Sequence, residues 1–379
     1  MKKVRNLLKK EPMLTLSMLA ALTGFIITPP SEKLLGQIDW RTLGTLLMML
    51  CVLEGFKQEN VLSPLAGLAG RLGSMTSLTL FLVFGVFFSS MFVTNDVSLL
   101  IFVPLTIMLF RSSGKECYIL PVISMENIAA IRGSLLTPFG SPQNLFLYGQ
   151  SGVSVWRFML HMLPMCLMSA VILAGFVFFL YRRDVHERAD VGRGSLPVTA
   201  KGFRRWMYLA LFVLILLVII TRTPHWLPVL GIVIITIAVT DRKLFLKVDY
   251  ALLVTFLCFF VFSSSIASNS SIAGFLESSV AGREYWWGIG LSQLISNVPA
   301  SIVLYPFTRN FAGLIYGVDT AGLCSIIGSL ASVINYRIYV REYPGQGRKF
   351  IRVFTLVSWA FFLIVVIPGF LLSGWDFFS

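Results

Sequence analysis

Short polar segments interrupt two long apolar stretches, one in each half of the chain. The first is Thr94-Asn95-Asp96 and the second begins Ser296-Asn297. Each is followed by a further polar interruption, at residues 137–144 and 325–329. The side chains added there are mostly hydroxyls and amides, which hold an oxyanion or a hard cation without a buried counter-charge. We therefore expect these segments to bind a solute rather than to make or break bonds.

The backbone of these segments points to the same chemistry. Pro138 and Pro142 lack an amide hydrogen and interrupt helices, and Gly133 and Gly140 tolerate unusual dihedral angles and close approach. A broken helix leaves unpaired amides that attract anions and unpaired carbonyls that ligate Na⁺. Polar backbone at bilayer depth is tolerated only where it lines a protein cavity. Two such pairs of breaks predict an internally duplicated transporter with a central site.

The two halves can be aligned at these breaks. Asn95 corresponds to Asn297, and the later segments align as Thr137 with Ser325, Gly140 with Gly328 and Ser141 with Ser329. The predicted substrate-binding residues are Thr94, Asn95, Thr137, Gly140, Ser141, Asn144, Ser296, Asn297, Ser325, Gly328 and Ser329. The predicted ion-coupling residues are Asn95, Asp96, Gly140, Asn297 and Asp319.

Three charged residues near the breaks have more than one interpretation. A charged aspartate at the centre of a bilayer costs about 2.5–3.5 kcal/mol, so Asp96 is expected to ligate a cation or carry a proton, or else to cap a half-helix. Arg132 could attract an anion, pair with Glu126 or extend toward the interface. Asp319 resembles Asp96 in placement, although it could also lie nearer the outer surface.

Composition defines the broad class. Of the 379 residues, 56% are hydrophobic and 13% are charged, and apolar runs long enough to cross a bilayer recur along the chain. The net charge of +13 comes from short basic loops, which argues against nucleic acid as a partner. The scattered cysteines and histidines give no metal-site spacing, and no Walker-type loop is present. We expect no cofactor, with Na⁺ possible as a co-transported ion.

The basic loops predict the topology. The N-terminal arm and the loops at 182–205, 241–249 and 337–352 carry most of the charge and are expected in the cytoplasm. Nine crossings and two re-entrant hairpins satisfy this pattern, with the N-terminus cytoplasmic and the C-terminus periplasmic. The hairpin tips are placed at 94–96 and 296–299, and the broken helices at 133–144 and 317–329. The arms of the first hairpin are expected to have about 15 residues each, short of the ~20 that a spanning helix needs.

The same counting divides the chain into two repeats. The first runs over residues 12–182 and the second, inverted in the membrane, over residues 226–373. Residues 183–225 form a basic cytoplasmic loop and a linker helix between them. The expected fold is an all-α polytopic membrane protein with inverted repeats.

At these motifs the chain resembles the ion transporter superfamily, which contains divalent-anion/sodium symporters, citrate transporters and arsenite permeases. The resemblance is carried by residues 94–100, 137–144, 296–300 and 317–335. It implies that hairpin tips and broken-helix loops bind a carboxylate and Na⁺. It also implies a homodimer in which a transport domain moves against a scaffold, as an elevator does.

One departure from the family pattern leaves the substrate open. Dicarboxylate symporters of this superfamily usually have Ser-Asn-Thr at both tips, whereas the third positions here are Asp96 and Val298. The sequence thus predicts a secondary transporter of the inner membrane that moves a carboxylate or an inorganic oxyanion with Na⁺ or H⁺. Arsenite or antimonite efflux and Na⁺/H⁺ exchange are the alternatives. The sequence contains neither an HExxH motif nor paired intramembrane aspartates, so an intramembrane enzyme has little support. A purely structural membrane scaffold would not explain polar breaks that are costly in a bilayer.

Overall fold

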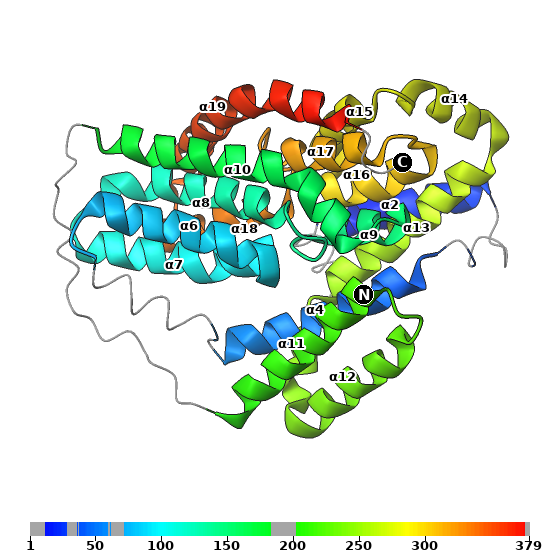
Figure 1. Cartoon of the computed structure of the whole chain (residues 1–379), viewed down its shortest axis with the longest axis horizontal. Coiled ribbons are helices and arrows are strands. Elements are labelled where there is room, and N and C mark those ends of the chain that lie inside the picture. Colours follow the sequence, from blue (N-terminus) through cyan, green and yellow to red (C-terminus); the bar gives the residue numbers. More distant parts are fainter. Residues whose placement is uncertain are drawn as a thin grey trace.

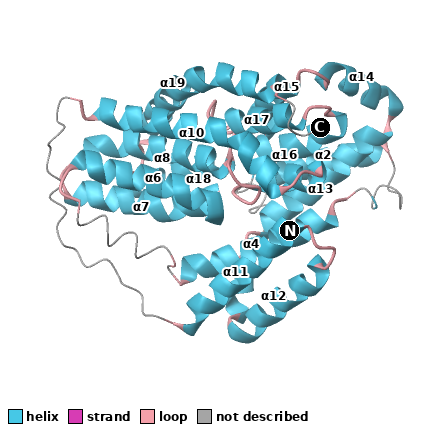
Figure 2. Ribbon diagram, viewed as in Figure 1, coloured by secondary structure: helices cyan, strands magenta, loops and turns pink. Residues whose placement is uncertain are grey.

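The computed structural model describes residues 12–28, 36, 38–59, 61, 72–182 and 202–375, and the regular structure in these ranges is helical (Figure 2). The expected all-α class is confirmed. The basic N-terminal arm and residues 183–201 of the basic central loop lie outside the described residues. The predicted linker helix corresponds to a helix at Phe203–Thr221.

Within the described ranges, six helices are long and apolar enough to cross a bilayer. They are α6 (Met75–Val93), α7 (Asn95–Ser112), α10 (Val155–Leu180), α11 (Phe203–Thr221), α13 (Tyr250–Ser268) and α19 (Gly347–Ser373). Two shorter helices, α2 (Pro12–Ile27) and α12 (Trp226–Thr240), are also apolar. These helices agree with a polytopic membrane protein. The count of nine crossings and the inverted orientation remain predictions, because length and composition alone do not position a helix in the bilayer.

A single residue separates the two arms of each predicted hairpin. Thr94 lies between α6 and α7, and Ser296 lies between α15 (Glu284–Ile295) and α16 (Asn297–Leu304). The arms of the first hairpin contain 19 and 18 residues, more than expected. The expected length was too short because α6 begins directly after its cap at Ser74 and α7 continues through Arg111, so almost the whole interval is helical.

Each predicted broken helix is observed as two helices joined by a short loop. The first pair is α8 (Ile119–Ser134) and α9 (Pro142–Ser151), and the second is α17 (Phe311–Ala321) and α18 (Leu330–Glu342). Gly133 and Gly317 were expected in the breaks, but both lie inside helices. They instead allow close packing, because an added Cβ would overlap the carbonyl oxygen of Phe87 at Gly133 and of Tyr285 at Gly317. These glycines let α8 lie directly on α6, and α17 on α15.

The helices form two groups (Figure 1). We call α6–α10 and α15–α19 the central body; in it the hairpins pack on the broken helices, with α10 and α19 against α8. We call α2, α4 (Trp40–Gln58), α11, α12 and α13 the flanking group, in which α4 packs against α11 and α12 while α13 packs against α2 and contacts α4. In Figure 1, α4, α11 and α12 lie apart from the rest of the molecule, whereas α13 reaches α16. Helix α14 (Ser270–Val280) follows α13. The groups meet where α13 contacts α16 and where α4 contacts α9.

Candidate functional site

The two hairpin tips have the same backbone conformation. Thr94 has φ 71° and ψ 153°, and Ser296 has φ 69° and ψ 160°. A positive φ of this kind disfavours a side chain and costs about 1–3 kcal/mol. The surrounding structure must hold both residues there. At each tip the chain reverses through one residue and immediately starts a new helix.

A backbone hydrogen bond ties each tip to the neighbouring broken-helix loop. The N–H of Asn95 donates to the carbonyl oxygen of Gly140 at 3.2 Å, and the N–H of Asn297 donates to that of Gly328 at 3.1 Å. An added Cβ would meet the carbonyl oxygen of Ser134 at Gly140, and that of Ala321 at Gly328. Only glycine fits these loops, so the two aligned glycines have the same role.

The remaining aligned positions also have the same local geometry. Gly140 N–H donates to the carbonyl oxygen of Thr137 at 3.3 Å, as Gly328 N–H does to that of Ser325 at 3.2 Å. Ser141 and Ser329 both have extended backbone directly before a helix, at φ −149° and −147°. The alignment made from the sequence therefore matches corresponding positions in the two loops.

Several predicted binding residues hold the loops rather than face a cavity. The Asn144 side chain donates to the carbonyl oxygen of Ser134 at 3.1 Å, and the Thr137 hydroxyl donates to the carbonyl oxygen of Met91. In the second loop the Ser325 hydroxyl donates to Gln293 Oε1 at 2.7 Å. These bonds fix the loops in place, since each satisfies a polar group within an apolar surrounding.

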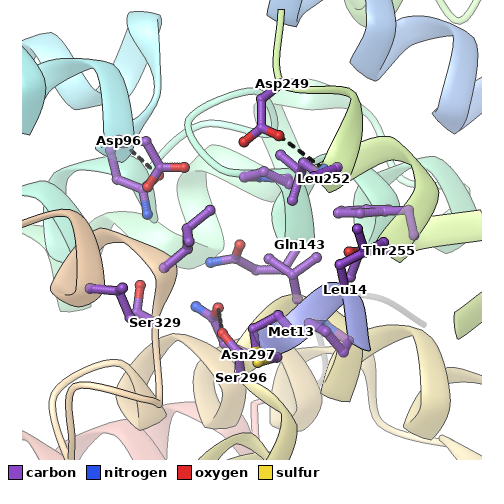
Figure 3. A pocket seen from close by; sticks show the side chains of 18 of the residues that line it. Met13, Leu14, Asp96, Gln143, Asp249, Leu252, Thr255, Ser296, Asn297 and Ser329 are labelled. Carbon is purple, nitrogen blue, oxygen red and sulfur yellow. Dashed lines mark hydrogen bonds between the residues drawn. The ribbon is translucent and has the colours of Figure 1, made fainter. Parts of the chain in front are cut away.

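Both tips line one cavity of about 150 Å³, where the central body faces α2 and α13 (Figure 3). Figure 3 shows Asn297, Ser296 and Ser329 grouped on one side and the carboxylates of Asp96 and Asp249 on another. Of the residues predicted from the sequence, those that line it are Asn95, Asp96, Ser296, Asn297 and Ser329. The predicted residues Thr94, Thr137, Gly140, Ser141, Asn144, Ser325 and Gly328 are not among its lining residues.

Four helices begin at this cavity. The first residues of α7, α9, α16 and α18, which are Asn95, Pro142, Asn297 and Leu330, all line it. A helix N-terminus carries a partial positive charge, although the first N–H groups of α7 and α16 already donate to Gly140 and Gly328. The cavity is therefore electrostatically suited to an anion, although the wall also contains apolar residues such as Leu14 and Phe256.

Asp96 brings a carboxylate to the cavity. Its Oδ1 is buried, and its carboxylate accepts no hydrogen bond from the described part of the chain. Its backbone N–H donates to Asn95 Oδ1 at 2.9 Å. The capping interpretation is therefore unsupported, because capping requires the carboxylate to accept an amide hydrogen.

Arg132 and Asp319 lie away from the cavity and pair with each other. Arg132 Nη1 is 2.5 Å from Asp319 Oδ2, and Nη2 donates to the Thr320 hydroxyl at 3.2 Å. Both charged side chains are almost completely buried, so Arg132 does not extend to the interface and Asp319 does not lie at the surface. Glu126 accepts a hydrogen bond from Thr106 instead of from Arg132. The ion pair joins α8 to α17, the first segments of the two broken helices.

Four polar residues of the cavity were not among the predicted site residues, and one of them is Thr255 of α13. Gln143 follows Pro142 at the start of α9, Asp249 precedes α13, and Arg337 lies on α18. Gln143 stood inside a motif that the sequence did single out. Asp249 and Arg337 had been assigned only to basic loops, and nothing local to them signals a cavity, because residues next to α13 and on α18 come to one cavity only in the folded protein.

The apolar helices, the interrupted segments and the shared cavity together define a multi-pass helical membrane transporter. Residues 7–328 match the family model described as citrate transporter, so the chain belongs to the citrate transporter family. The chain is 29% identical to the inner membrane protein YbiR of Escherichia coli K12 over 345 residues. This match covers 88% of this chain and 89% of the relative. It is 28% identical over 303 residues to the "uncharacterized transporter MJ0456" of Methanocaldococcus jannaschii, covering 79% and 81%.

Proposed function

We propose that this protein is a secondary active transporter that moves a small anion, a carboxylate or an inorganic oxyanion, across the inner membrane. The observation that carries the proposal is the convergence of four helix N-termini on one cavity lined by Asn95, Ser296, Asn297 and Ser329. Amide hydrogens and hydroxyls neutralise an anion without a fixed counter-charge, so the anion can still leave. The family description as citrate transporter supports a carboxylate as the first substrate to test.

The same cavity supports coupling to Na⁺ or H⁺. Asp96 places a carboxylate without a hydrogen-bond donor beside the anion-binding groups, where it can accept a proton or ligate a cation. One charge that crosses 100 mV contributes about 2.3 kcal/mol, close to fiftyfold in concentration. The pair of carboxylates Asp96 and Asp249 in one cavity also favours Na⁺/H⁺ exchange as a second candidate.

We further propose an elevator-type movement of the central body against the flanking group, in a homodimer with its N-terminus in the cytoplasm. The cavity is lined by Asp249 and Arg337, which belong to segments whose basic charge predicts the cytoplasmic side. On this assignment the structure represents the inward-open conformation. In this proposal the central body moves against the cavity wall that α2 and α13 form.

Uptake into proteoliposomes tests the proposal. Labelled citrate, phosphate and sulfate are each offered with a Na⁺ gradient, a proton gradient or neither. We expect one anion to accumulate only with a gradient, and Asn95→Ala or Asn297→Ala to abolish that accumulation. Asn269→Ala removes an equivalent amide from the start of α14, outside the cavity, and should transport normally. Sodium-driven proton release without uptake of any anion would favour exchange instead.

A further inference from the structure

An apolar groove lies on the central body, between α8, the last turns of α10 and the first half of α19. Helices α10 and α19 pack against α8, on the side that faces away from α4, α11 and α12 (Figure 1). The groove has a volume of about 620 Å³, and all of its lining residues are apolar. Its rim includes Phe179, Leu356 and Ile364, whose side chains are exposed. It shares no lining residue with the cavity at the hairpin tips.

The length of the groove corresponds to one leaflet of a bilayer. Its lining residues on α19 extend from Val353 to Ile364, which is about 16 Å at a rise of 1.5 Å per residue. The hydrocarbon core of a bilayer is about 30 Å thick, so the groove covers close to half of it. A partner helix that crosses the membrane would need a contact surface along the whole core. The acyl chain of a lipid in one leaflet needs only this half.

Three basic residues lie at one end of the groove. Arg182 follows the end of α10, and its guanidinium lies 4.3 Å from the centre of the Phe179 ring, which lines the groove. Lys349 and Arg352 each precede a lining residue of α19 by four positions, so they lie on the same face of that helix as the groove. All three are exposed, and none of them takes part in the ion pairs seen among the described residues.

We propose that this groove binds an anionic phospholipid, with an acyl chain between α10 and α19 and the headgroup phosphate at Arg182, Lys349 and Arg352. A neutral headgroup would leave these cations without a counter-charge, whereas an anionic one provides it. The segments that carry them are predicted to be cytoplasmic, and the cytoplasmic leaflet contains the anionic lipids that attract such basic clusters. The site is separate from the transport cavity, so the inference does not depend on the proposed substrate.

Native mass spectrometry of the full chain, released from detergent with added lipid, tests the headgroup contacts. Dioleoyl phosphatidylglycerol and dioleoyl phosphatidylcholine have the same acyl chains and differ in charge, and we expect the first to bind more tightly. Lys349→Gln with Arg352→Gln should weaken its binding about thirtyfold, because each basic residue near an anionic headgroup contributes about fivefold. The matched control, Arg242→Gln with Lys243→Gln, removes two exposed charges from another segment predicted to be cytoplasmic and should bind both lipids as the parent does.

Gly175 allows the acyl-chain part of the site to be tested separately. It lines the groove, and an added Cβ there meets no atom within 4 Å, so Gly175→Phe should fold normally and fill part of the groove. It should lose affinity for both lipids, because the ring excludes the acyl chain. Gly274→Phe on α14, where an added Cβ also meets open space, should bind both lipids as the parent does.

Thermal unfolding checks that each variant is folded. Equal affinity of the parent for the two lipids would overturn the proposal, as would unchanged binding by the Lys349→Gln, Arg352→Gln variant or an equal loss in its control. Dissociation of a dimer by Gly175→Phe would show instead that a second copy of the chain covers the groove. None of these measurements requires transport of an anion, so the lipid site can fail while the proposed function stands, and the reverse.

Discussion

The two halves of the site share a backbone design and differ in their charge. Thr94 and Ser296 have matching strained conformations, and the following asparagines donate to matching glycine carbonyls. Yet the first tip continues with Asp96 where the second has Val298, although both residues line the cavity. A duplicated backbone that presents amide groups suits an anion. Only the first tip carries a carboxylate, and this is where we propose that the coupling ion binds.

Removal of the Arg132–Asp319 ion pair, which joins the two halves, is expected to have the largest effect on stability. Asp319→Ala should lower the free energy of unfolding by about 3–5 kcal/mol, because it leaves the Arg132 charge buried and unpaired. Thermal unfolding in detergent measures the loss. Replacement of both residues with apolar side chains, Arg132→Met with Asp319→Leu, should recover most of the stability. A single variant as stable as the parent would contradict a pairing that joins the two broken helices.

Asp96 and Val298 distinguish the halves by function. Asp96→Asn should still bind an anion but lose accumulation by up to about fiftyfold, equivalent to one charge in a 100 mV potential. The loss of accumulation is measured as uptake of the anion at ion gradients of different size. Val298→Asp should not restore coupling in the Asp96→Asn background, because the two tips face the cavity from different sides. Unchanged coupling in Asp96→Asn would remove the proposed role of this carboxylate.

The aligned glycines should behave alike. Gly140→Ala and Gly328→Ala each push a Cβ against a backbone carbonyl, which we expect to cost about 2 kcal/mol and to displace the attached tip. Transport rate and thermal stability should fall together in both variants. Gly152→Ala, at the end of α9, has open space around it but a φ of 74°, so it should lose stability without losing anion binding. Different outcomes at Gly140 and Gly328 would break the equivalence of the loops.

The hydroxyls of the loops should give the smallest effect. Thr137→Val removes one hydrogen bond and Ser325→Ala removes two, and each lost bond should cost about 1 kcal/mol of stability. Neither side chain lines the cavity, so the affinity for the anion should change less than in the Asn95 or Asn297 variants. Binding titrations alongside thermal unfolding separate the two quantities. A large loss of affinity for the anion with unchanged stability would show that these hydroxyls contribute to anion binding.

The sequence was most informative about breaks in the chain. Proline, glycine and polar residues inside apolar runs disrupt helices wherever they occur, so the tips at Thr94 and Ser296 and both broken helices could be located. Partners across the fold were not accessible in this way. Arg132 pairs with Asp319, far away along the chain, and nothing in the local sequence selects that partner over Glu126.

The residues of the cavity walls could not be predicted from local sequence either. Asp249 and Arg337 belong to basic segments whose composition indicates only the side of the membrane, and their position at the cavity arises from packing of separate helices. Glycine was also ambiguous, since Gly317 permits close helix packing rather than a break. Local sequence therefore predicts where a helix ends, but the neighbours of a side chain depend on tertiary structure.

The central claim is that both tips hold the same solute, and ligand-dependent thermal stabilisation tests it most directly. Purified protein is heated with citrate, phosphate, sulfate and other small anions, and a ligand at a hundred times its Kd should add about 2.7 kcal/mol of stability. We predict that the most stabilising anion loses this effect in both Asn95→Ala and Asn297→Ala and keeps it in Asn269→Ala. Full stabilisation of either tip variant would contradict a jointly formed site.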